Sequence, residues 1–195
     1  LQGARDAGAQ AEEICLIDQD IHHCRGCFHC WFQTPGRCVY RDDMDALLPL
    51  FTGADIVCFA TPVYTHNMTA VLKNFIDRLV PLKSPRLAQH GGDFDLEDTD
   101  AKTSQYVTMA NAGFPGGNNF DTLREVFASC HPVLEIYRNC GRMLKAKDDR
   151  VQRYLGAVSR AAMELVQGGA VTGETREALS AEMIPDEEYV RILGM

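Results

Sequence analysis

Residues 56–68 read Ile-Val-Cys-Phe-Ala-Thr-Pro-Val-Tyr-Thr-His-Asn-Met, a continuous apolar run that passes directly into a polar loop. An apolar run such as Ile56–Ala60 is typical of a central strand that is buried on both faces of a sheet. Pro62 lacks an N–H group and favours an extended turn, and apolar residues recur at helical spacing from Asn67 onward. Parallel α/β sheets bind ligands at such strand–loop–helix connections. On residue chemistry alone, an ordinary connection between a strand and a helix stays open as the alternative.

Similar alternation of strand and helix patterns continues on both sides of this stretch. Further strands are predicted at Ala11–Ile17, Tyr106–Ala110 and Val133–Tyr137. Helices are predicted from Asp42 or Asp43, from near Asn67, over Thr122–Ser129, over Arg150–Val166, and from Thr172 onward. The Gly-, Asp- and His-rich stretch Ser84–Ser104 is expected to be a surface excursion. This pattern predicts a single α/β domain over residues 1–195, with a mostly parallel sheet covered by helices on both faces.

The first nine residues resemble the last turns of a helix that ends at a glycine. A doubly wound sheet places a strand and a turn before such a helix. We therefore expect roughly 20–30 further residues, including the first strand, to precede Leu1 in the full protein.

Composition excludes several classes of function. The chain carries a net charge of −8 and has no Lys/Arg run, which argues against a nucleic-acid surface. No stretch approaches the roughly 18 consecutive apolar residues of a membrane span. Because no charged-then-apolar leader opens the printed chain, a cytoplasmic protein is expected.

Four of the eight cysteines lie within 15 positions, inside a loop expected over residues 22–41. They form a C-x2-C-x2-C-x7-C array made of Cys24, Cys27, Cys30 and Cys38. Thiolates at this compact spacing suit one small inorganic centre, and the array fits a [4Fe–4S] cluster. Zinc with His22, His23 or His29 as a substitute ligand is one alternative, and free or disulfide-forming thiols are another. The remaining cysteines are expected to be buried small hydrophobic residues: Cys15, Cys58, Cys130 and Cys140.

A second loop follows the predicted strand Tyr106–Ala110 and reads Asn-Ala-Gly-Phe-Pro over residues 111–115. Gly113 in it allows close approach of the backbone to a ligand. With the motifs Ala54-Asp55-Ile56 and Lys73-Asn74-Phe75-Ile76-Asp77-Arg78, the two loops resemble the flavodoxin-like NADPH-dependent FMN reductases. The resemblance implies a flavodoxin-like, doubly wound, five-stranded parallel sheet whose first strand and phosphate loop lie outside the printed residues. It implies that FMN is held by Thr61, Pro62, Val63, Tyr64, Asn67, Met68, Asn111, Ala112, Gly113 and Phe114.

The cysteine array resembles that of the iron–sulfur flavoproteins, a branch of the same group, and this implies that its four thiols are cluster ligands. The expected activity is an FMN-dependent oxidoreductase that passes electrons from NAD(P)H to a quinone, a flavin or another acceptor, with chemistry carried by the flavin rather than by a catalytic side chain. The alternative is an electron carrier between a ferredoxin-like partner and FMN through a [4Fe–4S] cluster. A scaffold without cofactor is a third possibility. His66 is a further candidate for contact with flavin or substrate. The resemblance also implies a homodimer or homotetramer.

Overall fold

The computed structural model describes residues 1–90, 92–98 and 104–194. The chain forms two compact units, each made of stretches that are separated in sequence. The first unit comprises Leu1–Ile14, Cys58–Met68 and Tyr106–Met195, and the second comprises Cys15–Val57 and Thr69–Gln105. The expectation of a single domain over residues 1–195 stays a prediction. Among the described helices, none is both long and apolar enough to cross a membrane.

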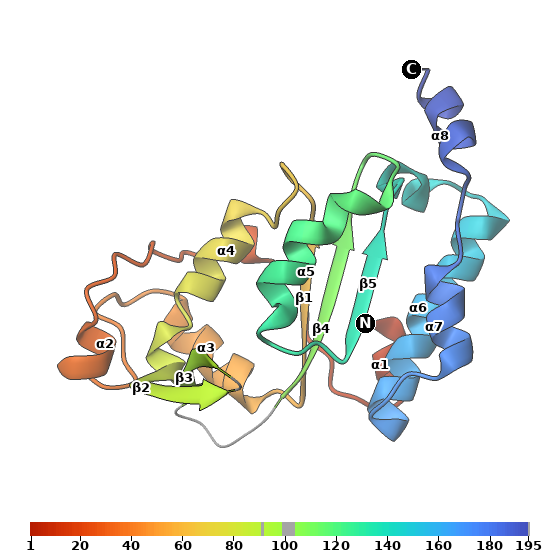
Figure 1. Cartoon of the computed structure of the whole chain (residues 1–195). Helices are drawn as coiled ribbons and strands as arrows, with labels where there is room; N and C mark the ends of the chain where they lie inside the picture. Colours follow the sequence, from red (N-terminus) through yellow and green to blue (C-terminus); the bar gives the residue numbers. More distant parts are fainter. Residues whose placement is uncertain (91, 99–103, 195) are drawn as a thin grey trace. The chain divides into compact units, whose positions relative to one another are not determined.

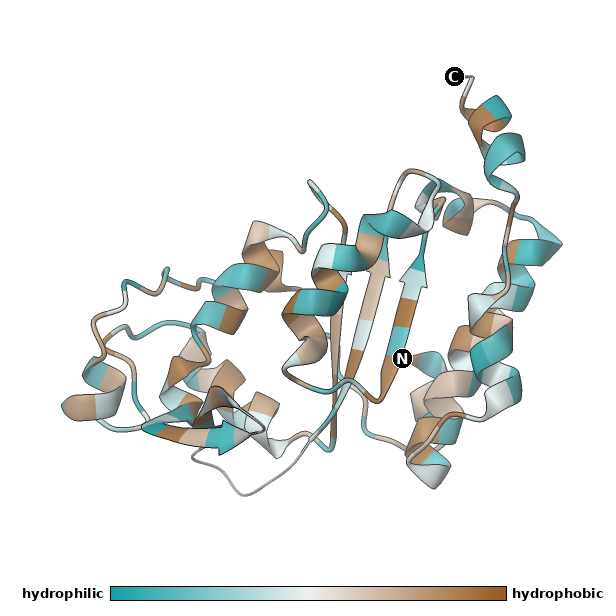
Figure 2. Ribbon diagram, in the orientation of Figure 1, coloured by the Kyte–Doolittle hydropathy of each residue, from teal (hydrophilic) through white to brown (hydrophobic). Residues whose placement is uncertain are grey.

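A three-stranded parallel sheet lies at the centre of the first unit (Figure 1). The order is β1-β4-β5, with β1 at Ile56–Pro62, β4 at Gln105–Asn111 and β5 at Leu134–Arg138. Hydropathy alternates along β5 (Figure 2), because Leu134 and Ile136 are buried while Glu135 is exposed. The predicted α/β architecture with a parallel sheet is confirmed, with three strands in the described residues where five were expected.

The prediction of a strand at Ala11–Ile17 is wrong. Residues 11–15 are neither helix nor strand, and a 3₁₀ turn spans Leu16–Asp18. The Asp18 N–H donates to the Cys15 carbonyl at 3.1 Å and so closes this turn locally. An extended apolar segment becomes a strand only where a neighbouring strand pairs with its backbone. The described sheet ends at β1.

The expectation that β1 is a central strand buried on both faces is also wrong. Its residues alternate, with Phe59 and Thr61 buried and Cys58 and Ala60 exposed. The buried Phe59 ring stacks on Phe127 of α5 (Asp121–Ala128), with 5.6 Å between the ring centroids. β1 is thus an edge strand of the described sheet, and one of its faces is packed.

Four further helices belong to the first unit. They are α1 at Gln2–Asp6, α6 at Asp149–Gly168, α7 at Gly173–Ser180 and α8 at Asp186–Leu193. α1 lies so close to α6 that a Cβ atom at Gly3 would stand 2.1 Å from the Ser159 carbonyl oxygen. The expected opening helix, the long amphipathic helix and the helix after Thr172 are therefore confirmed. α8 adds a helix that the sequence pattern did not predict.

The second unit contains the predicted helix after Asp43, which is α3, together with two further helices and a hairpin. These are α3 at Met44–Gly53, α2 at His29–Phe32, α4 at Ala70–Asp77, and an antiparallel hairpin of β2 (Lys83–His90) and β3 (Asp93–Asp98). α4 begins three residues later than expected, where the Thr69 hydroxyl caps the helix by accepting from the Leu72 N–H at 3.4 Å. The hairpin occupies most of the expected excursion over residues 84–104, of which residues 91 and 99–103 lie outside the described residues.

A buried ion pair holds the two ends of the cysteine loop. The Arg78 guanidinium donates to both carboxylate oxygens of Asp42, at 2.6 and 3.1 Å, and both side chains are essentially inaccessible to solvent. Arg78 also donates to the His22 carbonyl at 2.6 Å, and Asp42 accepts from the His22 N–H at 3.0 Å. Burial opposes ionisation of Asp42, but the Arg78 and His22 hydrogen bonds outweigh it and lower the pKa of the carboxyl group. Residue 22 is thereby fixed beside residue 42.

We expect Asp42→Ala to lower the free energy of unfolding by about 3–5 kcal/mol, because it leaves the Arg78 charge buried without a partner. Urea denaturation followed by circular dichroism measures this loss. Since the folded pKa of Asp42 is depressed, its contribution is present above the unfolded value of about 3.9 and declines as pH falls through the folded value.

The matched control is Asp45→Ala, which removes an exposed i,i+4 partner of Arg41 from the same helix region. Its expected cost is below about 0.5 kcal/mol. Equal losses for the two variants would show that the buried pair is not a special anchor.

Candidate functional site

Two of the predicted ligand loops meet at the carboxyl edge of the sheet. Thr61–Tyr64 completes β1, and Asn111–Phe114 completes β4, its neighbour in the sheet. The Val63 N–H donates to the Asn111 carbonyl at 2.8 Å and ties the two loops together. The structure therefore brings together the two segments that the sequence selected, at the place where open α/β sheets bind ligands.

The predicted site residues divide into supporting and accessible positions. Thr61, Met68 and Ala112 are buried, and Pro62, Val63 and Asn67 are partly buried. Tyr64, Asn111, Gly113 and Phe114 are exposed. Tyr64 is 65% exposed and Phe114 is 64% exposed, so each loop presents one aromatic ring to a ligand or a partner surface.

The first loop ends in a strained two-residue turn. Tyr64 and Asn67 exchange both backbone hydrogen bonds, at 2.9 and 3.1 Å. Between them Thr65 and His66 have φ values of 50° and 61°, in the left-handed region that a β-branched residue such as Thr adopts at a cost. The Asn67 side-chain oxygen accepts from the Met68 N–H at 2.8 Å. Strain of this kind in a tight turn is typical of binding sites.

The second loop is held by a buried asparagine that the sequence did not single out. Asn119 donates from its side-chain amide to the carbonyls of Phe114, Pro115 and Gly116, at 3.3, 2.9 and 2.7 Å. The carbonyls of the loop are therefore committed to the interior. Among the described residues, the N–H groups of Gly113 and Phe114 have no hydrogen-bond partner. These donors suit the electron-rich atoms of a ligand.

Two more residues support this loop from segments far along the chain. The buried Tyr189 of α8 donates its hydroxyl to the Gly113 carbonyl at 2.8 Å, and the Gly141 N–H donates to the Ala112 carbonyl at 2.8 Å. A Cβ atom at Gly141 would lie 2.8 Å from the Asn111 side-chain oxygen and 3.1 Å from the Ala112 carbonyl oxygen. A side chain at position 141 therefore requires the Asn111 side chain to turn away and the Ala112 carbonyl to shift slightly. No local sequence signal links Tyr189 to a residue 76 positions away.

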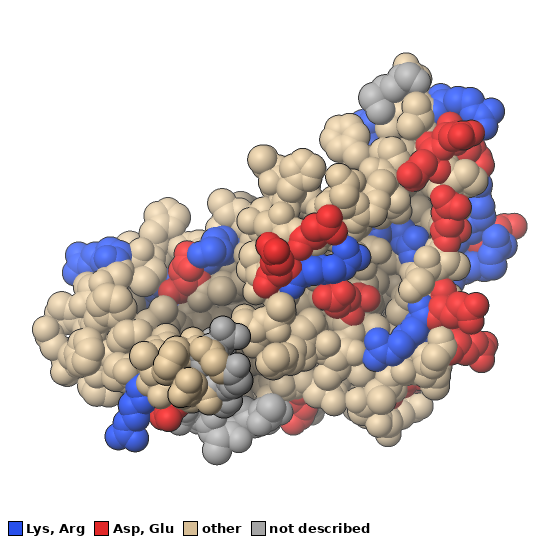
Figure 3. Space-filling model, in the orientation of Figure 1, with Lys and Arg blue, Asp and Glu red and all other residues tan. Residues whose placement is uncertain are grey.

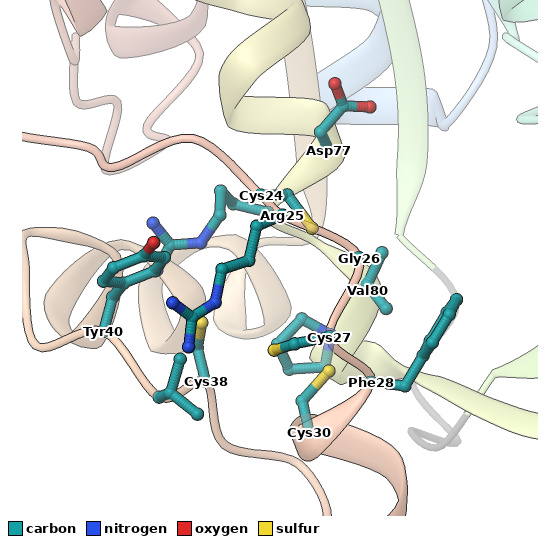
Figure 4. Close-up of a pocket in the computed structure, with 13 residues that line it drawn as sticks. Cys24, Arg25, Gly26, Cys27, Phe28, Cys30, Cys38, Tyr40, Asp77 and Val80 are labelled. Atoms are coloured by element: carbon teal, nitrogen blue, oxygen red, sulfur yellow. The ribbon is translucent and has the colours of Figure 1, made fainter.

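The four clustered cysteines line one pocket of about 110 Å³ in the second unit (Figure 4). Two residues in left-handed conformation, Gly26 with φ 64° and Phe28 with φ 53°, turn the chain between the first three cysteines. Trp31 then anchors the loop by donating its indole N–H to the Val80 carbonyl at 3.1 Å. The loop geometry therefore collects Cys24, Cys27, Cys30 and Cys38 around a common space.

The thiols of this pocket influence one another electrostatically. The His29 backbone N–H, and after it the Arg25 and His29 side chains, lower the pKa of Cys27 to about 7. Burial raises the pKa of Cys30, and the nearby Cys38, Cys24 and Cys27 thiols raise it further. Metals bind the thiolate form of cysteine, so the lowered pKa of Cys27 favours metal binding at this residue.

Several observations test whether this pocket suits a metal group. In the part of the chain that the structure describes, no three His, Cys, Asp or Glu side chains converge closely enough to hold one metal ion. A single zinc ion needs all its sulfur ligands about 2.3 Å from one point, whereas a cluster takes each thiolate on a different iron. Of the three proposed substitute ligands, His22 and His23 are engaged by Asp42 at 3.3 Å and Asn74 at 3.0 Å. The buried Nδ1 of His29 has no hydrogen-bond partner among the described residues. The described side chains are therefore not arranged to hold a single metal ion, and the four thiols are of the donor type that an iron–sulfur cluster takes.

The other four cysteines lie outside this pocket. Cys140 is buried and Cys130 is partly buried, but Cys15 and Cys58 are exposed, so the expectation that all four are buried is wrong for two of them. Cys58 lies on β1, the edge strand of the described sheet, and Cys15 directly precedes the 3₁₀ turn at Leu16–Asp18. No disulfide joins any of the eight cysteines, all of which lie in the described residues.

Curated relatives of this chain include several iron-sulfur flavoproteins. One from Archaeoglobus fulgidus is 41% identical over 81 residues, which are 42% of this chain and 36% of that protein. One from Methanocaldococcus jannaschii is 34% identical over 83 residues, 43% of this chain and 42% of that protein. One from Methanosarcina thermophila is 32% identical over 88 residues, 45% of each. The chain thus matches less than half the length of these relatives.

Among solved structures, a flavone reductase has the same fold, with a TM-score of 0.53 and 21% identity over 86% of this chain and 56% of that one. The family model described as NADPH-dependent FMN reductase matches residues 1–130, a span that includes β1, β4, both ligand loops and the cysteine pocket. The chain belongs to the NADPH-dependent FMN reductase family.

Proposed function

We propose that this protein is an FMN-dependent oxidoreductase that takes electrons from NAD(P)H and passes them to a quinone, a flavin or another acceptor. The observation that carries the proposal is the junction of the β1 and β4 loops through Val63 and Asn111. It joins an exposed aromatic ring, Tyr64, to two N–H donors without protein partners, those of Gly113 and Phe114. Family membership supports FMN as the group that this edge would hold.

Bound FMN would supply the hydride and electron chemistry, and the protein would supply position and electrostatics. The N–H groups of Gly113 and Phe114 would donate to electron-rich atoms of the ring. The carbonyls of these two residues already accept from Tyr189 and Asn119, which fixes the direction of the loop backbone. The Tyr64 ring offers a flat surface for stacking. The buried Thr61 and Met68 keep the first loop in place. With Pro62, Val63, Asn67, Asn111 and Ala112, these residues make up the proposed cofactor site.

The cysteine pocket favours a second candidate, an electron carrier of the iron–sulfur flavoprotein kind. In this alternative Cys24, Cys27, Cys30 and Cys38 hold a [4Fe–4S] cluster that exchanges electrons with FMN and with a ferredoxin-like partner. The support comes from the four thiols around one pocket and from the names of the curated relatives. Either function would suit a cytoplasmic homodimer or homotetramer in which a second subunit covers the exposed rings of Tyr64 and Phe114.

The first prediction from the proposed function concerns the source of electrons. When the protein is loaded with FMN under anaerobic conditions, NADPH or NADH is expected to bleach its yellow absorbance without any other protein. Stopped-flow absorbance measures the rate, and the control is free FMN with the same nucleotide at the same concentrations. A flavin that is bound yet bleached by neither nucleotide, but bleached by a reduced ferredoxin, would favour the electron carrier.

The second prediction concerns the support of the β4 loop. Gly141→Ala is expected to weaken FMN binding about tenfold or more, because the new methyl group collides with Asn111 and Ala112 and overpacking typically costs about 1–3 kcal/mol. Quenching of flavin fluorescence on titration gives the dissociation constant. The matched control is Gly156→Ala on α6, where no heavy atom lies within 4 Å of the new Cβ. If both variants bind FMN like the parent protein, the β4 loop does not hold the cofactor.

The third prediction concerns the cysteine pocket. After anaerobic reconstitution with ferrous iron and sulfide, Cys30→Ala is expected to lose most of the iron and labile sulfide bound by the parent protein. Cys15→Ala, which changes an exposed cysteine outside the pocket, is expected to keep both. Chemical iron and sulfide assays give the readout. Parental iron content in the Cys30 variant would remove that residue from the ligand set.

A further inference from the structure

Two arginine side chains line the four-cysteine pocket, and both lie against the ring of Tyr40. The guanidinium carbons of Arg25 and Arg78 lie 5.5 and 5.4 Å from the centroid of that ring, within the range of cation–π attraction. His22 stacks on the same ring with 4.7 Å between centroids. Tyr40 therefore fixes the position of both positive charges beside the thiols.

The two charges differ in how they are neutralised. Arg78 is buried and forms the bidentate ion pair with Asp42. Arg25 is exposed, and no carboxylate among the described residues forms an ion pair with it. Asp77 also lines the pocket, but its carboxylate pairs with Lys73 on the same helix. Arg25 is thus an unneutralised positive charge at the pocket.

The Arg25 side chain is aimed at one particular thiol. In Figure 4 its guanidinium lies between the Tyr40 ring and the Cys27 sulfur. Arg25 and Cys27 both line the pocket, and Arg25 is one of the groups that lower the pKa of the Cys27 thiol, after the His29 backbone N–H. Gly26, with φ 64°, makes the turn that lets the side chain of residue 25 reach back over residue 27. An exposed arginine is therefore held against the Tyr40 ring beside the thiols.

We propose that Arg25 is a positioning residue that raises the reduction potential of the group held by Cys24, Cys27, Cys30 and Cys38. The inference rests on the proposal that these four thiolates hold an iron–sulfur cluster. Four thiolates give such a cluster a net negative charge, and one-electron reduction makes it more negative. A nearby cation stabilises the reduced form more than the oxidised form. Net charge and hydrogen bonds to the sulfurs are the factors by which proteins set cluster potentials.

The test compares the parent chain with Arg25→Gln after anaerobic reconstitution with ferrous iron and sulfide. Redox titration with dithionite and mediators, followed by electron paramagnetic resonance, gives the midpoint potential. Arg25→Gln is expected to bind the same amount of iron but to titrate at a lower potential. Arg25→Lys, which keeps the charge, is expected to recover most of the difference. Because Arg25 is exposed, the difference should shrink at high salt, as a structural effect would not.

The matched control is Arg41→Gln, which removes an exposed positive charge that pairs with Asp45, one residue from Tyr40 but outside the pocket lining. It is expected to titrate like the parent. Parental potentials in Arg25→Gln, or equal shifts in both variants, would overturn the role of Arg25. Loss of iron from a folded Arg25→Gln protein would also overturn it, since the residue would then act in cluster assembly. A parent chain that binds no iron and sulfide would overturn the cluster and the tuning role together, a result distinct from a bound cluster whose potential does not move.

Discussion

A guanidinium group that leaves water needs partners for its charge and its N–H donors, and the partners of two buried arginines organise parts of both units. In the second unit, Asp42 accepts from both terminal nitrogens of Arg78, whose Nε has no partner among the described residues, and the pair fixes residue 22 through two further hydrogen bonds. In the first unit the buried Arg138 donates to the carbonyls of Leu179 and Ala181 at the end of α7 and lies 4.3 Å from the Tyr154 ring. Hydrogen bonds from buried guanidinium groups therefore help to hold the cysteine loop and the end of β5.

Hydrogen bonds also determine which backbone groups the loops at the carboxyl edge of the sheet offer to a ligand. Carbonyl groups of the β4 loop accept hydrogen bonds from Asn119, Gly141 and Tyr189. The backbone groups that this loop leaves for a ligand are the N–H donors of Gly113 and Phe114. The chain as a whole carries a charge of −8, and acidic and basic side chains are interspersed on the face drawn in Figure 3. Attraction of an electron-rich ligand must then come from local backbone donors rather than from the overall field.

Local patterns predicted much of the fold, because they report on interactions close in sequence. The amphipathic spacing of α6, the Asp42 cap before Met44 and the loop after β1 all depend on neighbours within a few residues. The strand expected at Ala11–Ile17 failed because an apolar run does not reveal whether a pairing partner exists. The turn at Thr65 and His66 also escaped prediction, since a β-branched residue at positive φ contradicts local preference.

The candidate site divides in the same way. The exposed residues that we propose to touch a ligand lie in contiguous loops, and the family resemblance of these loops selected them. The residues that hold those loops are Asn119, Gly141 and Tyr189, and they approach from later segments for which no motif specifies the contact. Arg25 differs from both groups, because it lies inside the cysteine motif yet is not one of its ligands. The cysteine motif indicates only the proposed ligand atoms. The proposed effect of the Arg25 charge on the reduction potential can be inferred only from the structure, in which Tyr40 holds the Arg25 side chain beside the thiols.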